Sequence, residues 1–129
     1  MNTYIEGKTE ILKTFSVKGF KTWRGREGVG AQATVYKDGK QIGWVTDEGN
    51  GGEVSLRATG EDERMIKDFL DTLPKYKFSD YWQERYGEDW DGEEKSELKS
   101  WVVHTFADVM LDRAEEATIA KANAKGGAR

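Results

Sequence analysis

The chain of 129 residues contains no cysteine, one proline and one histidine. The absence of cysteine excludes disulfides, thiol nucleophiles and cysteine-ligated zinc, and it fits a reducing cytoplasm. No apolar run approaches the roughly 20 residues needed to span a bilayer, and no basic stretch precedes an apolar one at the N-terminus. We therefore expect a soluble cytoplasmic protein with no membrane association.

Sequence signatures of catalysis are also scarce. The chain has no Gly-x-Ser-x-Gly elbow. His104 is followed by Asp108 and Asp112 at helical spacing, but no third nitrogen or sulfur ligand is near, so we interpret it as a hydrogen-bonded residue on a helix flank. The glycine-rich stretch 47–53 lacks the ligand spacing of a calcium loop. We predict no catalytic residue, metal or cofactor; the many carboxylates leave a small carboxylate-dependent hydrolase as an alternative.

Length and charge restrict the organisation further. The length is that of one ordinary domain, so we expect a single domain over residues 1–129. The net charge is −4, but residues 8–40 carry eight basic and three acidic side chains, whereas residues 80–97 carry eight acidic and two basic ones. This asymmetry predicts either an interaction surface or two halves that neutralise each other in the fold. The acidic total argues against tight binding to duplex DNA.

The middle of the chain predicts a β-meander centred on the Asp38-Gly39 turn. Counting outward from this turn gives three cross-strand pairs: Lys37 with Lys40, Val35 with Ile42, and Ala33 with Trp44. The last two pairs form the predicted buried face. The opposite face carries Thr34, Tyr36, Gln41 and Gly43. Strands are predicted at about 9–23, with a bend at Gly19, and at 30–37, 40–46 and 53–58.

Helices are predicted in the second half. Thr59 precedes Asp62 by three residues, as in a capping box, and begins a helix over 60–73 that Pro74 ends. A short helix is expected at 80–86. Asp91-Gly92-Glu93-Glu94 predicts the start of a long amphipathic helix over 92–120, with a mobile tail at 121–129. The predicted fold is α+β: a three- or four-stranded antiparallel sheet, then two or three helices packed on one face, with a long C-terminal helix.

The stretch 76–90 has the least ordinary composition, with six of the fifteen aromatic residues of the chain. Tyrosine and tryptophan are typical of interface hot spots. The predicted anchors of a partner-binding surface are Tyr81, Trp82, Tyr86 and Trp90. The acids predicted to orient that partner are Glu88, Asp89 and Asp91. The alternative is that the rings hold the helices on the sheet.

An arginine- and glycine-rich loop offers a second candidate site. Backbone amides beside arginines can bind a phosphate or an acidic group. The residues of this nucleotide-like ligand site are Arg24, Arg26, Gly28 and Gly30. The basic stretch 8–40 in the N-terminal half also contains Phe20, Trp23 and Tyr36, which are a candidate stacking platform for nucleic acid.

Three glycine-turn motifs carry a resemblance to known proteins. They are Lys18-Gly-Phe-Lys-Thr-Trp-Arg-Gly-Arg-Glu-Gly, Tyr36-Lys-Asp-Gly-Lys and Asp47-Glu-Gly-Asn-Gly-Gly-Glu. Over residues 18–53 the chain resembles small accessory proteins of tailed phages and prophages. The resemblance implies a protein that binds and inhibits a host protein, such as a nuclease-based defence complex, in the bacterial cytoplasm. The alternative is a protein that binds or sequesters a nucleotide-like molecule, and the last helix could also pair with a second copy.

Overall fold

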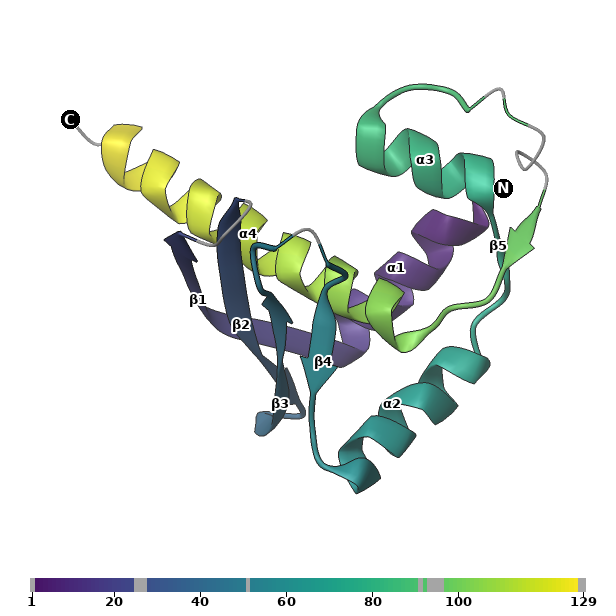
Figure 1. The fold of residues 1–129 in the computed structure, drawn as a ribbon, viewed down its shortest axis with the longest axis horizontal. Helices are drawn as coiled ribbons and strands as arrows, with labels where there is room; N and C mark the ends of the chain where they lie inside the picture. Colours follow the sequence, from purple (N-terminus) through teal and green to yellow (C-terminus); the bar gives the residue numbers. More distant parts are fainter. Residues whose placement is uncertain (1, 25–27, 51, 91, 93–96, 128–129) are drawn as a thin grey trace.

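The computed structural model describes residues 2–24, 28–50, 52–90, 92 and 97–127. Its elements follow in the order α1 (Thr3–Thr14), β1 (Phe15–Arg24), β2 (Val29–Lys37), β3 (Lys40–Asp47), β4 (Ser55–Arg57), α2 (Gly60–Asp71), β5 (Tyr76–Lys77), α3 (Phe78–Tyr86), β6 (Leu98–Lys99) and α4 (Val103–Gly127). The chain has the predicted α+β fold, with an antiparallel four-stranded sheet in the N-terminal half and a long last helix (Figure 1).

A helix, α1, occupies the region where the sheet was expected to begin. The Asn2 side chain accepts a hydrogen bond from the backbone N–H of Ile5 at 3.0 Å, which caps the first turn. Tyr4, Gly7 and Ile11 are buried at helical spacing. The strand predicted at 9–23 is therefore wrong before Phe15. Ile5 and Leu12 also pack against the core, but the polar residues between them hid this helical face in the sequence.

The strands pair in the order β1-β2-β3-β4. The predicted bend is confirmed, because the pairing of β1 with β2 shifts between Lys18 and Lys21 and Gly19 has a φ of 69°. The Asp38-Gly39 turn is also confirmed, with φ values of 53° and 79° that suit a tight hairpin turn. The third strand of the predicted meander, expected at 53–58, forms over Ser55–Arg57 only.

The register of the central hairpin differs from the prediction beyond its first pair. Lys37 pairs with Lys40 and Tyr36 with Gln41, but the register then shifts, so that three pairs follow: Val35 with Gly43, Thr34 with Trp44, and Ala33 with Val45. The predicted pairs of Val35 with Ile42 and Ala33 with Trp44 are wrong. One additional residue in β3 reverses which face each later side chain occupies. Trp44 is consequently 38% exposed, whereas Val45 is fully buried.

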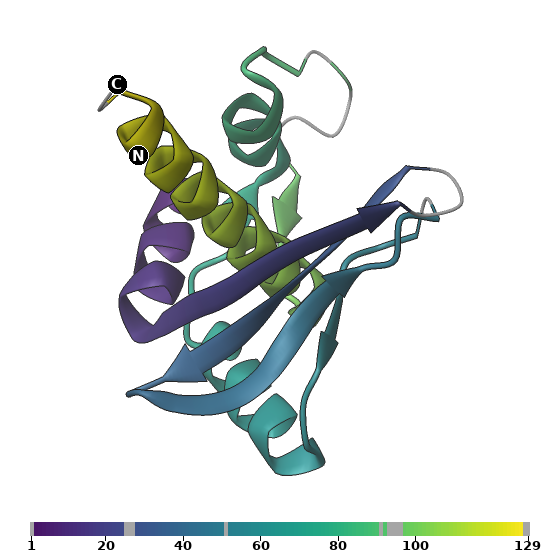
Figure 2. The same cartoon turned by 90° about the vertical axis from the view of Figure 1, so that its left-hand side faces the viewer.

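Helix α4 lies across one face of the sheet and contacts all four strands (Figure 1, Figure 2). The core lies between this helix, the sheet and α1 and α2. Its largest fully buried side chains are Phe106, Ile11, Ile66, Met110, Val35 and Val45. Phe15 contacts both α2 and α4, since its ring lies 5.3 Å from that of Phe69 and 5.0 Å from that of Phe106. The sheet thus has one face covered by α4.

The helix boundaries confirm one start signal and correct another. The Thr59 hydroxyl accepts a hydrogen bond from the Asp62 backbone N–H at 3.1 Å, so the predicted cap begins α2. The helix predicted from residue 92 instead begins at Val103. Residues 98–99 pair with 76–77 as a small two-stranded sheet, and this pairing competes with helix formation there. Asp91, Glu93 and Glu94 of the predicted start lie outside the described residues.

The last helix also extends further than expected. It was predicted to end near 120 but continues to Gly127. Alanine and lysine, which dominate residues 120–125, are strong helix formers and do not need a buried face. The side chains of residues 115–124 are exposed. Pairing of this helix with a second copy stays a prediction.

Candidate functional site

The aromatic residues of the stretch 76–90 form two groups around helix α3, an inner and an outer one, which meet where the Phe78 ring lies 6.0 Å from the Tyr81 ring. The helix ends where Gly87 adopts a left-handed conformation, with φ of 70°, and its N–H donates to the Gln83 carbonyl. At its start, the backbone N–H of Phe78 donates to the Glu97 carbonyl at 3.0 Å. These contacts fix both ends of a nine-residue helix whose first turn has no side-chain cap.

The inner group joins α3 to α1. The Tyr81 ring lies 5.4 Å from that of Tyr4 and 6.2 Å from that of Tyr76. Tyr4 in turn stacks on Trp101 at 5.1 Å. Burial raises the pKa of Tyr4, Tyr76 and Tyr81 above that of an exposed tyrosine. Tyr81, predicted as a partner anchor, therefore packs half-buried against the core.

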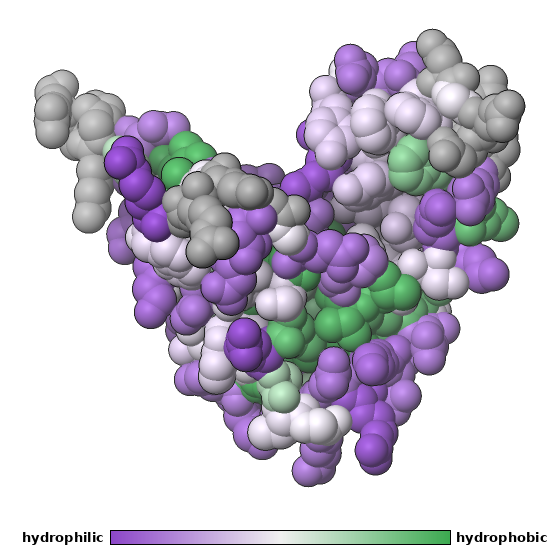
Figure 3. All heavy atoms as spheres, viewed as in Figure 1, coloured by the Kyte–Doolittle hydropathy of each residue, from purple (hydrophilic) through white to green (hydrophobic). Residues whose placement is uncertain are grey.

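The outer group forms what we call the α3 aromatic surface, defined as Phe78, Trp82, Tyr86 and Trp90. The first three lie one helical turn apart on one face. The Trp82 ring is 4.4 Å from that of Tyr86 and 4.5 Å from that of Trp90. Phe78 contacts Trp90 edge to face at 5.5 Å. Tyr86 is 54% exposed, and the other three rings are half-buried. In Figure 3 the surface over α3 is pale rather than strongly hydrophilic, as tyrosine and tryptophan are on this scale.

Ion pairs hold α3 against its neighbours from the inner side. Arg85 Nη1 lies 2.8 Å from Asp108 Oδ2 and 2.7 Å from Asp112 Oδ2, both on α4. Lys8 Nζ of α1 lies 2.8 Å from Glu84 Oε1. The helix is thus attached to two other helices by charge-assisted contacts. This attachment fixes the direction of the outer aromatic face.

Burial and charge act in opposite directions at the Arg85 cluster. Burial alone would lower the pKa of Arg85, but Asp108 and Asp112 raise it above the ordinary value, so the guanidinium stays charged. Burial raises the pKa of Asp108, and the attraction of Arg85 opposes that rise. The two aspartates are thus engaged with Arg85. His104 lies 3.9 Å from Glu53, and the described residues include no cluster suited to a metal ion.

Two of the predicted acidic residues lie between Tyr86 and Trp90 of the aromatic surface in the chain. Glu88 and Asp89 are exposed directly after Gly87. Asp91 lies outside the described residues. Exposed carboxylates beside an aromatic patch favour a partner surface that carries lysine or arginine.

The predicted arginine- and glycine-rich ligand site is only partly described. Arg24 is exposed at the end of β1, and Gly28 is exposed at the start of the next strand region. Arg26 lies outside the described residues. Gly30 is buried opposite Trp23, and a side chain there would collide with the Trp23 indole. Gly30 therefore has a packing role in the sheet, where it accommodates the tryptophan.

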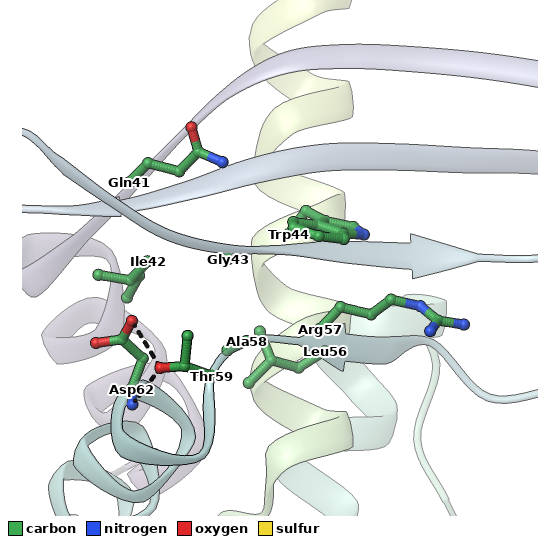
Figure 4. A pocket seen from close by; sticks show the side chains of 9 residues that line it. All are labelled: Gln41, Ile42, Gly43, Trp44, Leu56, Arg57, Ala58, Thr59 and Asp62. Atoms are coloured by element: carbon green, nitrogen blue, oxygen red, sulfur yellow. Dashed lines mark hydrogen bonds between the residues drawn. The ribbon is translucent and has the colours of Figure 1, made fainter.

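A groove that the sequence did not indicate lies at the β4 side of Trp44. It has a volume of about 710 Å³. Its lining residues are Gln41, Ile42, Gly43, Trp44, Leu56, Arg57, Ala58, Thr59 and Asp62 (Figure 4). Trp44 reaches this surface only because of the register shift in β3. At Gly43 a Cβ would collide with the Arg57 carbonyl oxygen, so the glycine allows β3 and β4 to approach each other closely. No residue pattern around Trp44 signals this shift.

In comparisons with known proteins, no family model, no curated protein and no solved structure matches the chain. Within the described part of the chain, no helix is long and apolar enough to cross a membrane.

Proposed function

We propose that this chain is a non-catalytic binding protein that attaches to another protein through the α3 aromatic surface. The clustering of the half-buried rings of Trp82 and Trp90 around Tyr86, which is 54% exposed, is the observation that carries the proposal. Clustered tyrosine and tryptophan rings of this kind supply large contact area at a low cost in side-chain entropy.

The attachment of α3 adds to this argument. Because the Arg85 ion pairs fix the helix from the inner side, the outer rings are held in position before a partner arrives. Pre-organisation of this kind lowers the entropic cost of association. Glu88 and Asp89 would then orient a basic patch of the partner and accelerate the encounter.

The proposed partner is a protein of a bacterial host, bound in its cytoplasm. The resemblance of residues 18–53 to accessory proteins of tailed phages supports this choice of partner, and inhibition of a nuclease-based defence complex is one form that the activity would take. An acidic surface suits such targets, because proteins that bind nucleic acid present basic surfaces.

The direct test is capture of partners by the tagged full-length chain from bacterial lysate, followed by mass spectrometry and affinity measurement on the captured protein. Tyr86→Ala should weaken binding at least tenfold, as expected for an interface hot spot. Ile119→Ala is the matched control, because Ile119 is also an exposed apolar residue, 51% exposed, but lies on α4. Equal binding by both variants and the unaltered chain would exclude the aromatic surface.

The acidic residues have a separate test. Glu88→Lys combined with Asp89→Lys should slow association and reduce its dependence on salt, because rim charges act chiefly on the association rate. Asp71→Lys is the control for a single charge reversal at an exposed position on α2. An unchanged association rate in the double variant would remove the electrostatic part of the proposal and leave the aromatic part standing.

A further inference from the structure

The face of the sheet opposite α4 combines aromatic rings with cations. Ala33, Val35 and Val45 are fully buried on the α4 side. Their neighbours along each strand point the other way. One cross-strand row on that outer face runs through all four strands: Lys18, Thr34, Trp44 and Arg57. At the ordinary strand spacing, this row is about 14 Å long.

A second row places another ring beside the first. Tyr36 is two residues from Thr34 on the same strand face and half-buried, and Lys18 Nζ lies 5.3 Å above its ring. Lys21 is exposed one row further along β1, opposite Gln32. Lys18, Lys21 and Arg57 thus lie around Trp44, which is 38% exposed, and Tyr36, which is half-buried. This is the one part of the described surface where the register brings rings and cations together across all four strands.

The groove beside Trp44 lies at the β4 edge of this face: Trp44 and Arg57 line it from the outer side, and Leu56, the pairing partner of Val45, lines it from the α4 side. Its volume of about 710 Å³ is within the range of ordinary ligand pockets. Gln41 contributes a side-chain amide, which both donates and accepts hydrogen bonds. Asp62 also lines the groove and would repel a phosphate, so the groove suits an uncharged base rather than the backbone of a nucleic acid.

We infer that this outer sheet face binds single-stranded nucleic acid. Unpaired bases would stack on Trp44 and Tyr36, with one base in the groove, while Lys18, Lys21 and Arg57 contact phosphates. Stacking on exposed rings within a cationic surface is the general mode of single-strand recognition, and a four-stranded sheet is a common platform for it. A duplex hides its base faces, so stacking on rings favours a single strand.

The charge pairing on this face leaves Arg57 available to a phosphate. Among the described residues it pairs with Glu48, with Arg57 Nη2 and Glu48 Oε1 at 3.9 Å and side-chain exposures of 62% and 50%. An ion pair this long and this exposed is weak. A phosphate, which accepts two parallel hydrogen bonds from a guanidinium, can replace it.

Fluorescence anisotropy with labelled oligo-dT and oligo-U of about 12 nucleotides tests the inference on the full chain, with a duplex of the same length for comparison. Both single strands should bind more tightly than the duplex at low salt, and any preference between them separates DNA from RNA. Trp44→Ala should weaken binding about tenfold, and Trp44→Phe should restore most of it, because a ring is retained.

The cations are tested by the salt dependence. Lys18→Gln should reduce the slope of log affinity against log salt by about 0.7, the value for one lost phosphate contact. Arg113→Gln is the matched control, because Arg113 is exposed on α4, which covers the opposite face. Thermal melts of all variants verify that they are folded.

Three results would overturn the inference: no single-strand binding at low salt, equal losses in Lys18→Gln and Arg113→Gln with no effect of Trp44→Ala, or tighter binding of an acidic peptide than of either oligonucleotide. The second result would indicate non-specific attraction to any cation. Tyr86→Ala should leave single-strand binding unchanged, so failure here and failure of the proposed α3 surface are distinguishable.

Discussion

Tyr4 shows what one buried phenol contributes to stability. Burial raises the pKa of Tyr4, Tyr76 and Tyr81 above the ordinary value, so all three keep their protons in the folded chain at a pH where the unfolded chain begins to lose them. The stability linked to these groups is fully present below pH of about 10 and is lost as the pH rises further.

The prediction is that Tyr4→Phe makes the alkaline loss of stability shallower. Each such tyrosine contributes at most about 1.4 kcal/mol per pH unit above its unfolded pKa, and the variant removes one of the three. Urea unfolding at several values between about pH 8 and pH 11 measures the slope. Tyr86→Phe, at an exposed position, is the control. Identical slopes for the unaltered chain and Tyr4→Phe would show that Tyr4 ionises equally well in both states.

At the same scale, Trp44 shows where the sequence stops being informative. The turn residues Asp38 and Gly39 determine the first pair of the hairpin, and that pair was predicted correctly. The shift after Tyr36 depends on how β3 approaches β4 at Gly43, a contact between segments separated by a loop. Local propensity contains no information on that approach, and the exposed tryptophan that follows from it was missed.

At the scale of elements, α1 depends on a close contact with the chain near the start of α4. Gly7 is buried on α1 beneath Trp101, and a Cβ at Gly7 would lie 2.5 Å from the Trp101 Nε1 atom. Trp101 is only 4% exposed and contacts Tyr4 and Tyr76, so it has little room to move. The glycine thus allows the helix to approach the indole.

We predict that Gly7→Ala destabilises the fold although alanine favours helices. The helix gains about 1 kcal/mol from the exchange, whereas overpacking a tight contact costs about 1–3 kcal/mol or more. The melting temperature should fall by several degrees. Gly60→Ala is the control, since Gly60 begins α2 with no atom near the position of a Cβ, and its effect should be neutral or stabilising. A higher melting temperature for Gly7→Ala would contradict the packing argument.

The elements that the sequence predicted correctly are those with local end signals. Thr59 begins α2, which ends at Asp71, two residues before the predicted end and three before Pro74, and Gly87 ends α3. The predicted start of α4 was wrong. It relied on the acidic, cap-like sequence at 91–94, but residues 98–99 after it pair with β5 instead of forming a helix. The aromatic composition of α3 was visible in the sequence, but which rings face outward follows from the attachment of the helix to α1 and α4.

At the scale of the whole molecule, Arg85 connects the part of the fold that carries the aromatic surface to the helix that covers the sheet. Its guanidinium reaches Asp108 and Asp112 on α4, and the Asp108 side chain is only 19% exposed. Removal of the arginine would leave Asp108 with its charge partly buried and its strongest partner gone. Removal of one member of such a pair costs more than the pair contributes.

Arg85→Met is therefore expected to lower the free energy of unfolding by about 1–3 kcal/mol, less than for a fully buried pair because the cluster is partly open to water. Hydrogen exchange should accelerate most in α3, which would lose its contact with α4. Lys13→Met breaks the exposed Lys13–Glu10 pair and should change stability by less than about 0.5 kcal/mol. Adding Asp108→Leu to Arg85→Met should recover part of the loss, because no partly buried charge then lacks its partner. If the double variant is less stable than Arg85→Met alone, the cost lies in packing around α3 rather than in the unpaired carboxylate.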